Sequence, residues 1–431
     1  TGYVKDAIAR YQTMNGLRVE RRFGWDCHGL PAEMGAEKDL GISGRAAIME
    51  YGIDKFNEYC RSSVMRYRDE WRYYVTRQGR WVDFDNDYKT MDKDFMESCL
   101  WAFKQLYDKG LVYESMRVMP YSWAAETPLS NFETRLDNAT REREDKAAYV
   151  KFKLKTRPDG APEAKNYYLI AWTTTPWTLP SNLALAVGKH MTYGCNVMGE
   201  DCLIAGKFAV TLFSGKDEPF AFEYEIAGTA LIGLSYEPLF PYFADTPNAF
   251  RVIDGSDAVL EGEGTGVIHM APGFGEIDQK ICADNGIEVI VPVDGQGKFT
   301  DAIYDLPDLS LKGLNVIDEQ RLEEGDKTQH IAEKDVAKFG LANMRILRWL
   351  KAHDRLVKDE VIKHNYPHCW RTDKPLIYRA MPSWYVAVTQ YRDRAAEVNK
   401  TIDWIPGHIR DGQMHHMLST APDWSISRNR F

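Results

Sequence analysis

The stretch that decides the fold is Trp172-Thr173-Thr174-Thr175-Pro176-Trp177-Thr178-Leu179-Pro180-Ser181-Asn182-Leu183-Ala184-Leu185-Ala186-Val187. It continues a β-rich apolar run and opens with three consecutive threonines. Pro176 and Pro180 lack backbone N–H donors, so they end the strand. We expect a strand that brings small hydroxyl groups to its end, followed by Asn182 and a new apolar run. A threonine-rich strand with a simple proline turn is the alternative interpretation.

The composition is that of a soluble globular protein. The 431 residues suffice for two or three domains, and 44% are hydrophobic and 27% charged. No apolar run approaches the length of a membrane span. The seven cysteines lack a Cys-x-x-Cys pair, which predicts free thiols in a reducing cytosol. The sequence begins without Met in an apparent mid-helix and ends abruptly, so we expect a segment of a longer protein.

The net charge of −9 is unevenly distributed. Residues 201–350 carry 12 Lys and Arg against 26 Asp and Glu, whereas the rest carries 42 against 37. A protein that coats nucleic acid would be basic throughout. If an RNA is bound, the basic flanks must therefore contact most of its backbone.

The sequence predicts α/β structure for the N-terminal part of the chain. Helices are expected over residues 1–15, 44–78 and 92–109, and a strand over 19–23. The loop 24–33 follows that strand, and in a parallel α/β sheet ligands bind at the carboxyl ends of the strands. Asp26 and His28 would lie at that position.

The middle of the chain changes character near residue 147. Short runs punctuated by Gly, Pro and Asp predict many strands and a β-barrel-like inserted domain. The strand candidates are 147–155, 167–175, 183–187, 194–198, 203–205, 222–231, 252–253, 266–270 and 289–293. Helices are expected again at 328–358 and 388–399, separated by a turn-rich knuckle at 367–376.

Two further groups of polar residues could join the threonines. A glycine-rich turn leads into a strand with His269, and a tight turn starts a short helix with Asp278 in its first turn. No Gly-Lys-Ser/Thr follows the glycines, so they do not form a phosphate loop. Hydroxyls can donate and accept, an imidazole can orient water, and a carboxylate can bind an ammonium ion. No pattern of a covalent nucleophile is evident.

Four motifs follow one another along the chain: Gly24-Trp25-Asp26-Cys27-His28-Gly29-Leu30-Pro31-Ala32-Glu33, the Trp172–Val187 stretch, Gly264-Thr265-Gly266-Val267-Ile268-His269-Met270-Ala271-Pro272-Gly273 and Asp423-Trp424-Ser425-Ile426-Ser427-Arg428-Asn429-Arg430. In this order they resemble the isoleucyl-tRNA synthetases, a branch of class I aminoacyl-tRNA synthetases. The valyl and leucyl enzymes carry Asp-His-Ala-Gly and Asp-Ala-Phe-Gly in the first motif, and Thr-Thr-Arg-Pro in the second. The resemblance therefore favours the isoleucine branch.

The resemblance implies an incomplete Rossmann-like parallel sheet domain, an inserted β-barrel-like editing domain and helical connective segments. The full enzyme would join isoleucine to tRNA(Ile) with ATP and Mg2+, and the insertion would hydrolyse Val-tRNA(Ile) without a cofactor. Thr173, Thr174 and Thr175 would line the editing pocket with Asn182 in support. His269 would exclude isoleucine, and Asp278 would bind the α-ammonium ion. In the synthetic half, Asp26 would meet the ammonium ion of isoleucine and Asn429 would lie near the adenylate.

Two departures from the family limit these expectations. The ATP signatures His-x-Gly-His and Lys-Met-Ser-Lys-Ser are absent, and their places would precede Thr1 and follow Phe431. Since these groups stabilise the transferring phosphates, we expect no adenylate formation by this chain. At the structural zinc site of some members, this chain reads Ser122-Trp123-Ala124-Ala125 and Cys369-Trp370-Arg371-Thr372. One thiolate of four is too few for a structural site, so we expect no zinc.

The expected domain boundaries follow from these changes in character. They are 1–60 for part of the catalytic domain, 61–146 for a helical connective region with a degenerate zinc knuckle, 147–330 for the editing domain, 331–358 for a helical return, and 359–431 for the second knuckle and the return to the catalytic domain. The expected partners are tRNA(Ile), isoleucine and valine, in a cytoplasmic monomer without membrane contact.

Three other functions are compatible with the sequence. The chain could bind tRNA without catalysis, for which the arginines of 61–77 offer weak support. It could be a free-standing editing hydrolase, although the remnants of a synthetic half argue against this. Editing by a related valyl or leucyl enzyme is the third.

Overall fold

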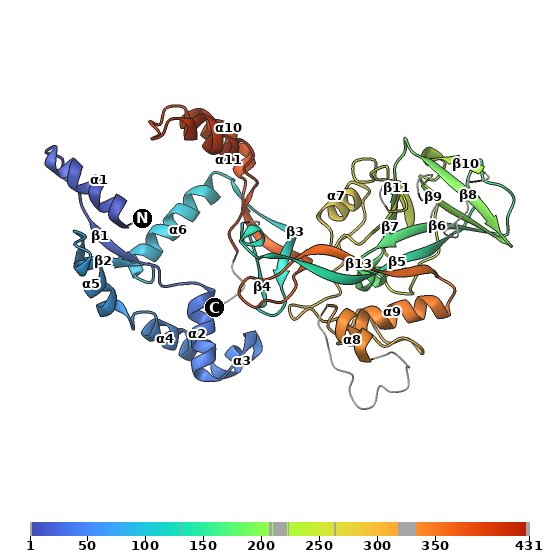
Figure 1. Cartoon of the computed structure of the whole chain (residues 1–431), viewed down its shortest axis with the longest axis horizontal. Coiled ribbons are helices and arrows are strands. Elements are labelled where there is room, and N and C mark those ends of the chain that lie inside the picture. The colour runs from blue at the N-terminus through green and yellow to red at the C-terminus, as the bar shows by residue number, and fades with distance from the viewer. Residues whose placement is uncertain are drawn as a thin grey trace. The chain divides into compact units, whose positions relative to one another are not determined.

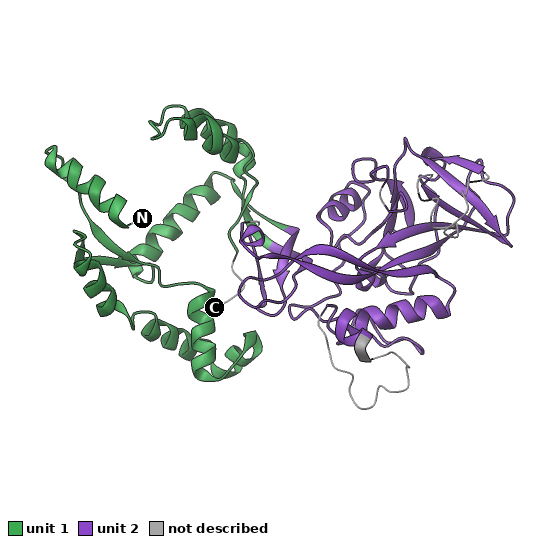
Figure 2. Cartoon of the chain, in the orientation of Figure 1, with its two compact units in different colours: residues 1–115, 383–431 green, residues 116–382 purple. Residues whose placement is uncertain are grey.

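A computed structural model describes residues 2–130, 132–206, 209, 222, 224–262, 264–317 and 333–427. The chain divides into two compact units, residues 1–115 with 383–431 and residues 116–382 (Figure 2). Within the described ranges, no helix has both the length and the apolar character that crossing a bilayer requires.

The first unit is mainly helical (Figure 1). Its elements are α1 (Gly2–Met14), β1 (Arg22–Trp25), α2 (Leu30–Leu40), α3 (Gly44–Tyr51), α4 (Ile53–Ser63), α5 (Arg68–Arg77), β2 (Asp83–Lys89), α6 (Lys93–Asp108), α10 (Arg392–Asn399), α11 (His415–Ser419) and β15 (Trp424–Ser425). Strands β1 and β2 pair in parallel, with Gly24 opposite Tyr88. The predicted parallel arrangement is thus confirmed for this pair.

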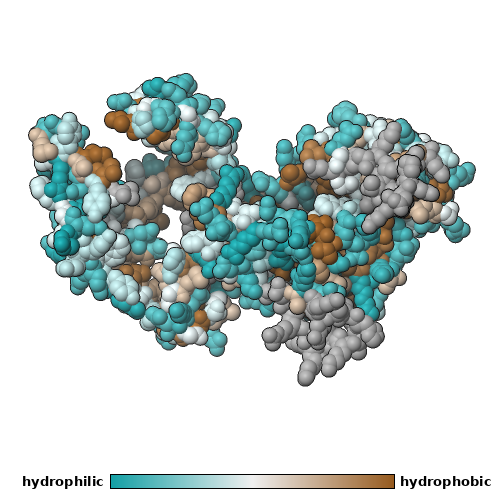
Figure 3. Space-filling view, in the orientation of Figure 1, coloured by the Kyte–Doolittle hydropathy of each residue, from teal (hydrophilic) through white to brown (hydrophobic). Residues whose placement is uncertain are grey.

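Glycines lie at several helix ends in this unit. The predicted helix 44–78 is three helices, and Gly52 separates α3 from α4 at a φ of 106° that a residue with a Cβ rarely adopts. Gly110, at a φ of 67°, follows the end of α6 as expected. Helix α6 buries none of its side chains, and Leu100 and Trp101 are exposed. Figure 3 shows apolar side chains on the surface of both units.

The second unit is built from sheets. Its elements are β4 (Thr127–Pro128), β5 (Thr140–Leu154), β6 (Asn166–Thr173), β7 (Ala184–Val187), β8 (Thr192–Met198), β9 (Asp201–Gly206), β10 (Tyr224–Ala227), β11 (Arg251–Asp254), β12 (Val267–Met270), α7 (Glu276–Asp284), α8 (Glu333–Phe339), α9 (Leu341–Ala352) and β13 (Leu356–Pro367). Strands β3 (Val112–Ser122) and β14 (Ile377–Val386) carry the chain into and out of this unit. They are neighbours in the four-stranded sheet β15-β14-β3-β4.

Two further sheets make up most of the second unit. The six-stranded sheet has the order β10-β8-β9-β6-β5-β13 and is antiparallel except for the parallel β6–β9 pair. The three-stranded sheet has the order β11-β7-β12, with β11 parallel and β12 antiparallel to β7. As far as the described residues show, both sheets are open. The barrel-like description of the insertion is therefore not confirmed.

The main core of the second unit packs around β7, whose four residues are completely buried. A strand covered on both faces is expected to be uniformly apolar, as this one is. Strand β6 also buries both faces: Leu169 and Ala171 join the main core, while Tyr168 and Ile170 join a smaller cluster. The threonine turn thus follows a rigid, buried strand.

Several expectations about strands are wrong. Residues 289–293 form no strand, and only Val293 makes an isolated bridge, to Phe299. The predicted helix 328–358 ends earlier, because β13 begins at Leu356 and pairs with residues 140–150 of β5. Many of its cross-strand neighbours are ionic, for example Lys146 with Asp359 at 2.6 Å. Such polar strands lack the apolar alternation by which strands are predicted.

The expectation that every cysteine is a free thiol is also wrong. Cys195 of β8 and Cys202 of β9 form a disulfide with their Cα atoms 6.2 Å apart. The two strands make an antiparallel hairpin in which Cys195 lies opposite Ile204 and Val197 opposite Cys202. The residues are therefore diagonal neighbours, within the Cα distance that a disulfide spans. Their separation of seven residues does not reveal this without the hairpin register.

Candidate functional site

The threonine run folds into a tight turn at the end of β6. The strand ends at Thr173, and a 3-10 helix follows from Pro176 to Ser181. Thr173 Oγ1 accepts a hydrogen bond from the Thr175 N–H at 3.1 Å, and Thr178 Oγ1 donates to the Thr175 carbonyl at 2.8 Å. The Thr175 and Thr178 hydroxyls are 3.3 Å apart. The turn therefore gathers hydroxyl groups at one strand end, as predicted.

A distant asparagine holds this turn in place. Asn343, on α9, accepts a hydrogen bond from the Trp177 N–H at 3.0 Å through its Oδ1. Its Nδ2 donates to the Phe339 carbonyl at 2.9 Å. Because both groups are buried, the turn is tied to α9 by bonds that water cannot replace at low cost.

His269 lies on β12, opposite Leu185 of β7, and its side chain is buried. Its Nε2 is 2.9 Å from Thr178 Oγ1. Burial lowers the pKa of His269 from 6.5 to about 4, because the imidazolium cation would lose its hydration. The imidazole is therefore neutral at pH 7 and serves as a hydrogen-bonding group without charge.

Asn182 lies on the other side of the imidazole. Its Nδ2 donates to the Ala184 carbonyl at 2.9 Å and is 3.5 Å from His269 Nδ1. Its Oδ1 accepts a hydrogen bond of 2.7 Å from the hydroxyl of Tyr236. The imidazole is thus held between Thr178 and Asn182, and all of these side chains are buried.

Asp278 is in the first turn of α7, where its presence was predicted. Its Oδ2 accepts a hydrogen bond of 2.9 Å from the N–H of Ala271, two residues after His269. Burial raises the pKa of Asp278 from 3.8 to about 6, against the opposing effect of hydrogen bonds from the N–H groups of Ala271 and Asp278. The carboxyl is mostly ionised at pH 7 and poorly solvated, so a cationic ligand would stabilise it.

Gly275 precedes α7 because the carboxyl of Asp278 leaves no room for a side chain there. A Cβ on Gly275 would lie 2.6 Å from Asp278 Cγ. The backbone at Gly275 has a φ of −125°, which any residue can adopt, so the restriction is one of space alone.

The structure brings together most of the predicted residues of this site. Hydrogen-bonding contacts link Thr173, Thr175, Asn182 and His269 into one group, which also includes Thr178 and Tyr236. Thr174 lies in the bend between β6 and the 3-10 helix and is partly buried. Asp278 is connected to the group through the backbone at Ala271.

Sequence reasoning missed two members of the group. Thr178 could have been found, because it lies three residues after Thr175 and one turn of a 3-10 helix brings such residues to one side. Tyr236 gives no local signal, since it is far from the threonine run in the sequence and only the packing of the core brings its hydroxyl to Asn182.

The residues expected at a synthetic site are described only in part. Asp26 follows the carboxyl end of β1, as predicted, and is exposed; its Oδ1 accepts from the His28 N–H at 3.4 Å. Asn429 lies outside the described residues.

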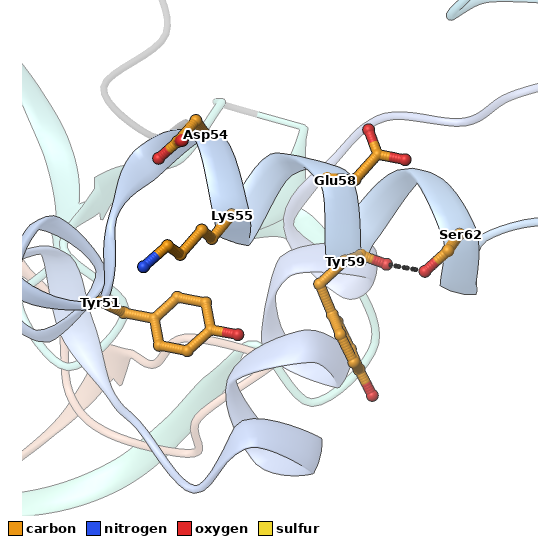
Figure 4. Close-up of a pocket in the computed structure, with 6 residues that line it drawn as sticks. All are labelled: Tyr51, Asp54, Lys55, Glu58, Tyr59 and Ser62. Atoms are coloured by element: carbon orange, nitrogen blue, oxygen red, sulfur yellow. Dashed lines mark hydrogen bonds between the residues drawn. The ribbon is translucent and has the colours of Figure 1, made fainter.

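A pocket in the first unit involves none of these residues. It runs along one face of α4, with Tyr51 of α3 at one end, and Figure 4 shows Lys55 directed towards the Tyr51 ring. It is lined by Tyr51, Asp54, Lys55, Glu58, Tyr59 and Ser62. These residues are mostly exposed, and Ser62 Oγ donates to the Tyr59 carbonyl at 2.8 Å. The pocket is an open groove on a solvated helix face.

The predicted degenerate knuckle contains an apolar contact. Cys369 is buried in a small cluster with Leu129 and Leu376. Among the residues whose positions are described, no three His, Cys, Asp or Glu side chains come together as metal ligands would. The absence of zinc remains a prediction.

The sequence was compared with known proteins. The family model described as "tRNA synthetases class I (I, L, M and V)" matches residues 1–431. Isoleucine–tRNA ligase of Rickettsia conorii is 56% identical over 437 residues, which cover 100% of this chain and 37% of that protein. The same ligase of Wolbachia pipientis wMel is 53% identical over 470 residues, covering 100% and 40%. The predicted resemblance to the isoleucine branch is thereby confirmed.

These relatives are much longer than the chain, which spans about two fifths of their length. Among solved structures, one titled "The crystal structure of GlLeuRS-CP1" is 16% identical and covers 50% of this chain and 99% of its own, with a TM-score of 0.31. A TM-score this low does not support the assignment of a family. The family model does support one, because it matches residues 1–431, and this chain therefore belongs to the class I tRNA synthetases of the I, L, M and V group.

Proposed function

We propose that this chain contains the editing site of an isoleucyl-tRNA synthetase and hydrolyses Val-tRNA(Ile) there. The protein of full length would join isoleucine to tRNA(Ile) with ATP and Mg2+ in the cytoplasm, as a monomer. The observation that carries the proposal is the hydrogen-bonded group of Thr175, Thr178, Asn182 and His269, which is connected to the ionisable Asp278 through the Ala271 backbone.

The chemistry of this group suits hydrolysis of an ester without a strong base. Water would attack the aminoacyl carbonyl, helped by the terminal ribose hydroxyl, and the ester bond to that ribose would break. The neutral imidazole and the threonine hydroxyls would orient the reactants. Asp278 would bind the α-ammonium ion, and this pairing would offset the unfavourable solvation of its carboxylate.

Selection of valine would depend on the size of this site. One methylene changes binding by only about 1–3 kcal/mol, a limit for which isoleucyl-tRNA synthetase is a known example. A second site that admits valine and excludes isoleucine therefore raises accuracy. The rigid contact between Thr178 and His269 supports this role, because a hydrogen-bonded pair in a buried turn resists the expansion that isoleucine would need.

The proposed domain boundaries are those that the family resemblance implies. We propose that residues 147–330 form the editing domain, with 61–146 and 331–358 as connective regions, and that 1–60 and 359–431 contribute to a Rossmann-like catalytic domain. Strand β1 lies in residues 1–60, and its parallel partner β2 lies in the region proposed as connective. Asp26 and Asn429 would belong to the substrate site of the catalytic domain. No step of the ligation reaction is assigned to the described residues.

The proposal is tested by deacylation of Val-tRNA(Ile) and Ile-tRNA(Ile) by the purified chain. We expect hydrolysis of the first substrate only, and its loss in Asp278→Ala. Asp284→Ala is the matched control, because Asp284 is an exposed carboxylate on the same helix and should be dispensable. An unchanged rate in Asp278→Ala would contradict the assignment.

The same assay separates hydrolysis from binding alone. Salt-dependent binding of tRNA(Ile) without deacylation would favour the second candidate, a tRNA-binding segment. The structure gives that candidate little support in residues 61–77, where Arg66, Arg68 and Arg72 face acidic partners. Those partners are Asp39, Asp87 and Asp85.

A further inference from the structure

We propose that Gln279 is a positioning residue, which holds the first half of α7 against β3 and so places Asp278 for the α-ammonium ion of the substrate. The inference rests on the proposed editing function, because that function gives Asp278 its ligand. Gln279 follows Asp278 directly in the sequence, and no motif that the sequence suggests as a site includes it.

Gln279 uses its side-chain amide to bind the backbone of β3 at two points. Its Nε2 donates to the Met116 carbonyl at 2.8 Å, and its Oε1 accepts from the Val118 N–H at 3.1 Å. Because one end of an amide donates and the other accepts, the two bonds together require one orientation of the side chain. The amide thereby makes the pair of bonds that one residue of a neighbouring strand makes.

The two bonds lie on the edge of β3 that β4 also uses. Next to β4, Leu129 donates its N–H to the Pro120 carbonyl at 2.8 Å. Alternate residues of a strand turn their backbone N–H and C=O groups to the same edge, so Met116 and Val118 face the edge of Pro120. The Gln279 amide therefore continues the cover that the β4 segment gives to this edge.

The rotation of α7 depends on its directional contacts. The buried residues of this helix are Ile281 and Cys282, which both lie in its second half. Apolar packing is not directional, so it brings the helix to the core without fixing its rotation. Among the residues that the structure describes, only Asp278 and Gln279 make side-chain hydrogen bonds in the first half, residues 276–280.

These two residues restrict the helix to different degrees. Asp278 makes its bond through Oδ2 to the Ala271 N–H, and rotation about its side-chain bonds can keep that contact while the helix turns. Gln279 makes two bonds from one planar amide, which restrict both distance and direction. The backbone of the adjacent Asp278 is thereby held, and its carboxylate keeps the direction in which it meets the α-ammonium ion.

The functional test compares two esters of tRNA(Ile) in Gln279→Met, which keeps the length of the side chain and removes both bonds. One ester is Val-tRNA(Ile). The other carries 2-hydroxyisovaleric acid, which has a hydroxyl in place of the α-ammonium ion. We expect kcat/KM to fall about tenfold for the first, less than a 1 Å misplacement can cost, and to change little for the second.

The comparison separates positioning from general damage to the site. A general distortion slows both esters, whereas a displaced Asp278 affects only the ester with an ammonium ion. Equal losses on the two esters would overturn the inference, and so would an unchanged rate on Val-tRNA(Ile).

Lys280→Met is the matched control. Lys280 follows Gln279 on the same helix and is exposed, and the described part of the chain offers it no hydrogen bond or ion pair. We expect the ratio of the two hydrolysis rates to equal that of the parent. A selective loss on Val-tRNA(Ile) as large as in Gln279→Met would overturn the specific role of Gln279.

Hydrogen exchange tests the contact without catalysis. The Val118 amide should exchange slowly in the parent, because it donates to Gln279, and at least about tenfold faster in Gln279→Met. The Ile204 amide, within the β8–β9 pair, should keep its rate and shows that the fold is intact. Equal protection of Val118 in both chains would overturn the inference.

A second variant covers the case in which Gln279→Met does not fold. Gln279→Glu keeps the acceptor for the Val118 N–H and replaces the donor to the Met116 carbonyl by an oxygen. We expect a loss on Val-tRNA(Ile) with little change on the hydroxy ester. A proportional loss on both esters would overturn the inference in this variant too.

The parent chain separates the inference from the proposed function. If the parent hydrolyses neither ester, the proposed function fails, and the role of Gln279 in catalysis fails with it, even where exchange at Val118 confirms the contact. If the parent hydrolyses Val-tRNA(Ile) and Gln279→Met does so at the same rate, the proposed function stands and only the inference fails.

Discussion

Replacing Asp278 with asparagine should make the second unit more stable while it abolishes editing. Burial raises the pKa of this carboxyl from 3.8 to about 6, so at pH 7 the folded chain holds a charge that it solvates poorly. A shift of about two pKa units corresponds to roughly 3 kcal/mol. An amide accepts the Ala271 N–H bond less strongly than a carboxylate, which removes about 1 kcal/mol of that gain. The expected net gain is about 2 kcal/mol.

The effect of Asp278 on stability depends on pH, and its direction follows from the raised pKa. Between about pH 4 and pH 6, the folded chain binds more protons at Asp278 than the unfolded chain does, so its contribution to stability falls as the pH rises. His269 acts in the opposite direction. Its folded pKa is lowered to about 4, so its contribution is lost as the pH falls from about 6.5. The two slopes nearly cancel in the parent chain.

The assay is urea unfolding of the parent and of Asp278→Asn, followed by hydrogen exchange of peptides that cover β7 and β12. The difference between the two chains isolates Asp278. It should be near zero at pH 4 and should reach its full value above about pH 6.5. A variant that is less stable than the parent at pH 7, or a difference independent of pH, would refute the reasoning.

Three other substitutions follow from the geometry of the site. Thr178→Val keeps the shape but leaves His269 Nε2 without its hydrogen-bond partner, so Val-tRNA(Ile) hydrolysis should fall at least tenfold, with a loss of about 1–3 kcal/mol in unfolding free energy. Gly275→Ala should displace the Asp278 carboxyl and reduce deacylation as Asp278→Ala does, whereas Gly35→Ala, with open space around it, should have no effect in the same assay. Asn343→Ala should lower the free energy of unfolding by about 1–3 kcal/mol, because the Trp177 N–H loses its partner; a melting temperature equal to that of the parent would contradict this.

The part of the site that could be predicted consists of residues whose type and local position both indicate chemistry. The threonine run lies where a buried strand meets two prolines, and His269 and Asp278 lie at the end of a strand and the start of a helix. Polar groups at the ends of strands and helices are a local signal, so a short stretch of sequence indicates their function.

The part that could not be predicted depends on contacts between distant segments. Tyr236 and Asn343 are single polar residues whose partners lie in other elements, and neither spacing nor composition identifies those partners. Strand β13 was missed for another reason. Its side chains pair with charges on β5, so the strand reads as a solvated segment.

The pairing of β3 with β14 bears on how a segment like the second unit could be gained or lost in evolution. Because the chain enters and leaves the second unit through adjacent strands of one sheet, its two ends are close together. A segment with adjoining ends can be gained, lost or exchanged by recombination with little disturbance to the host sequence around it. The proposed editing activity could therefore be gained or lost in a single genetic event, and a short peptide joining the two strands would test whether the remaining chain folds without the second unit.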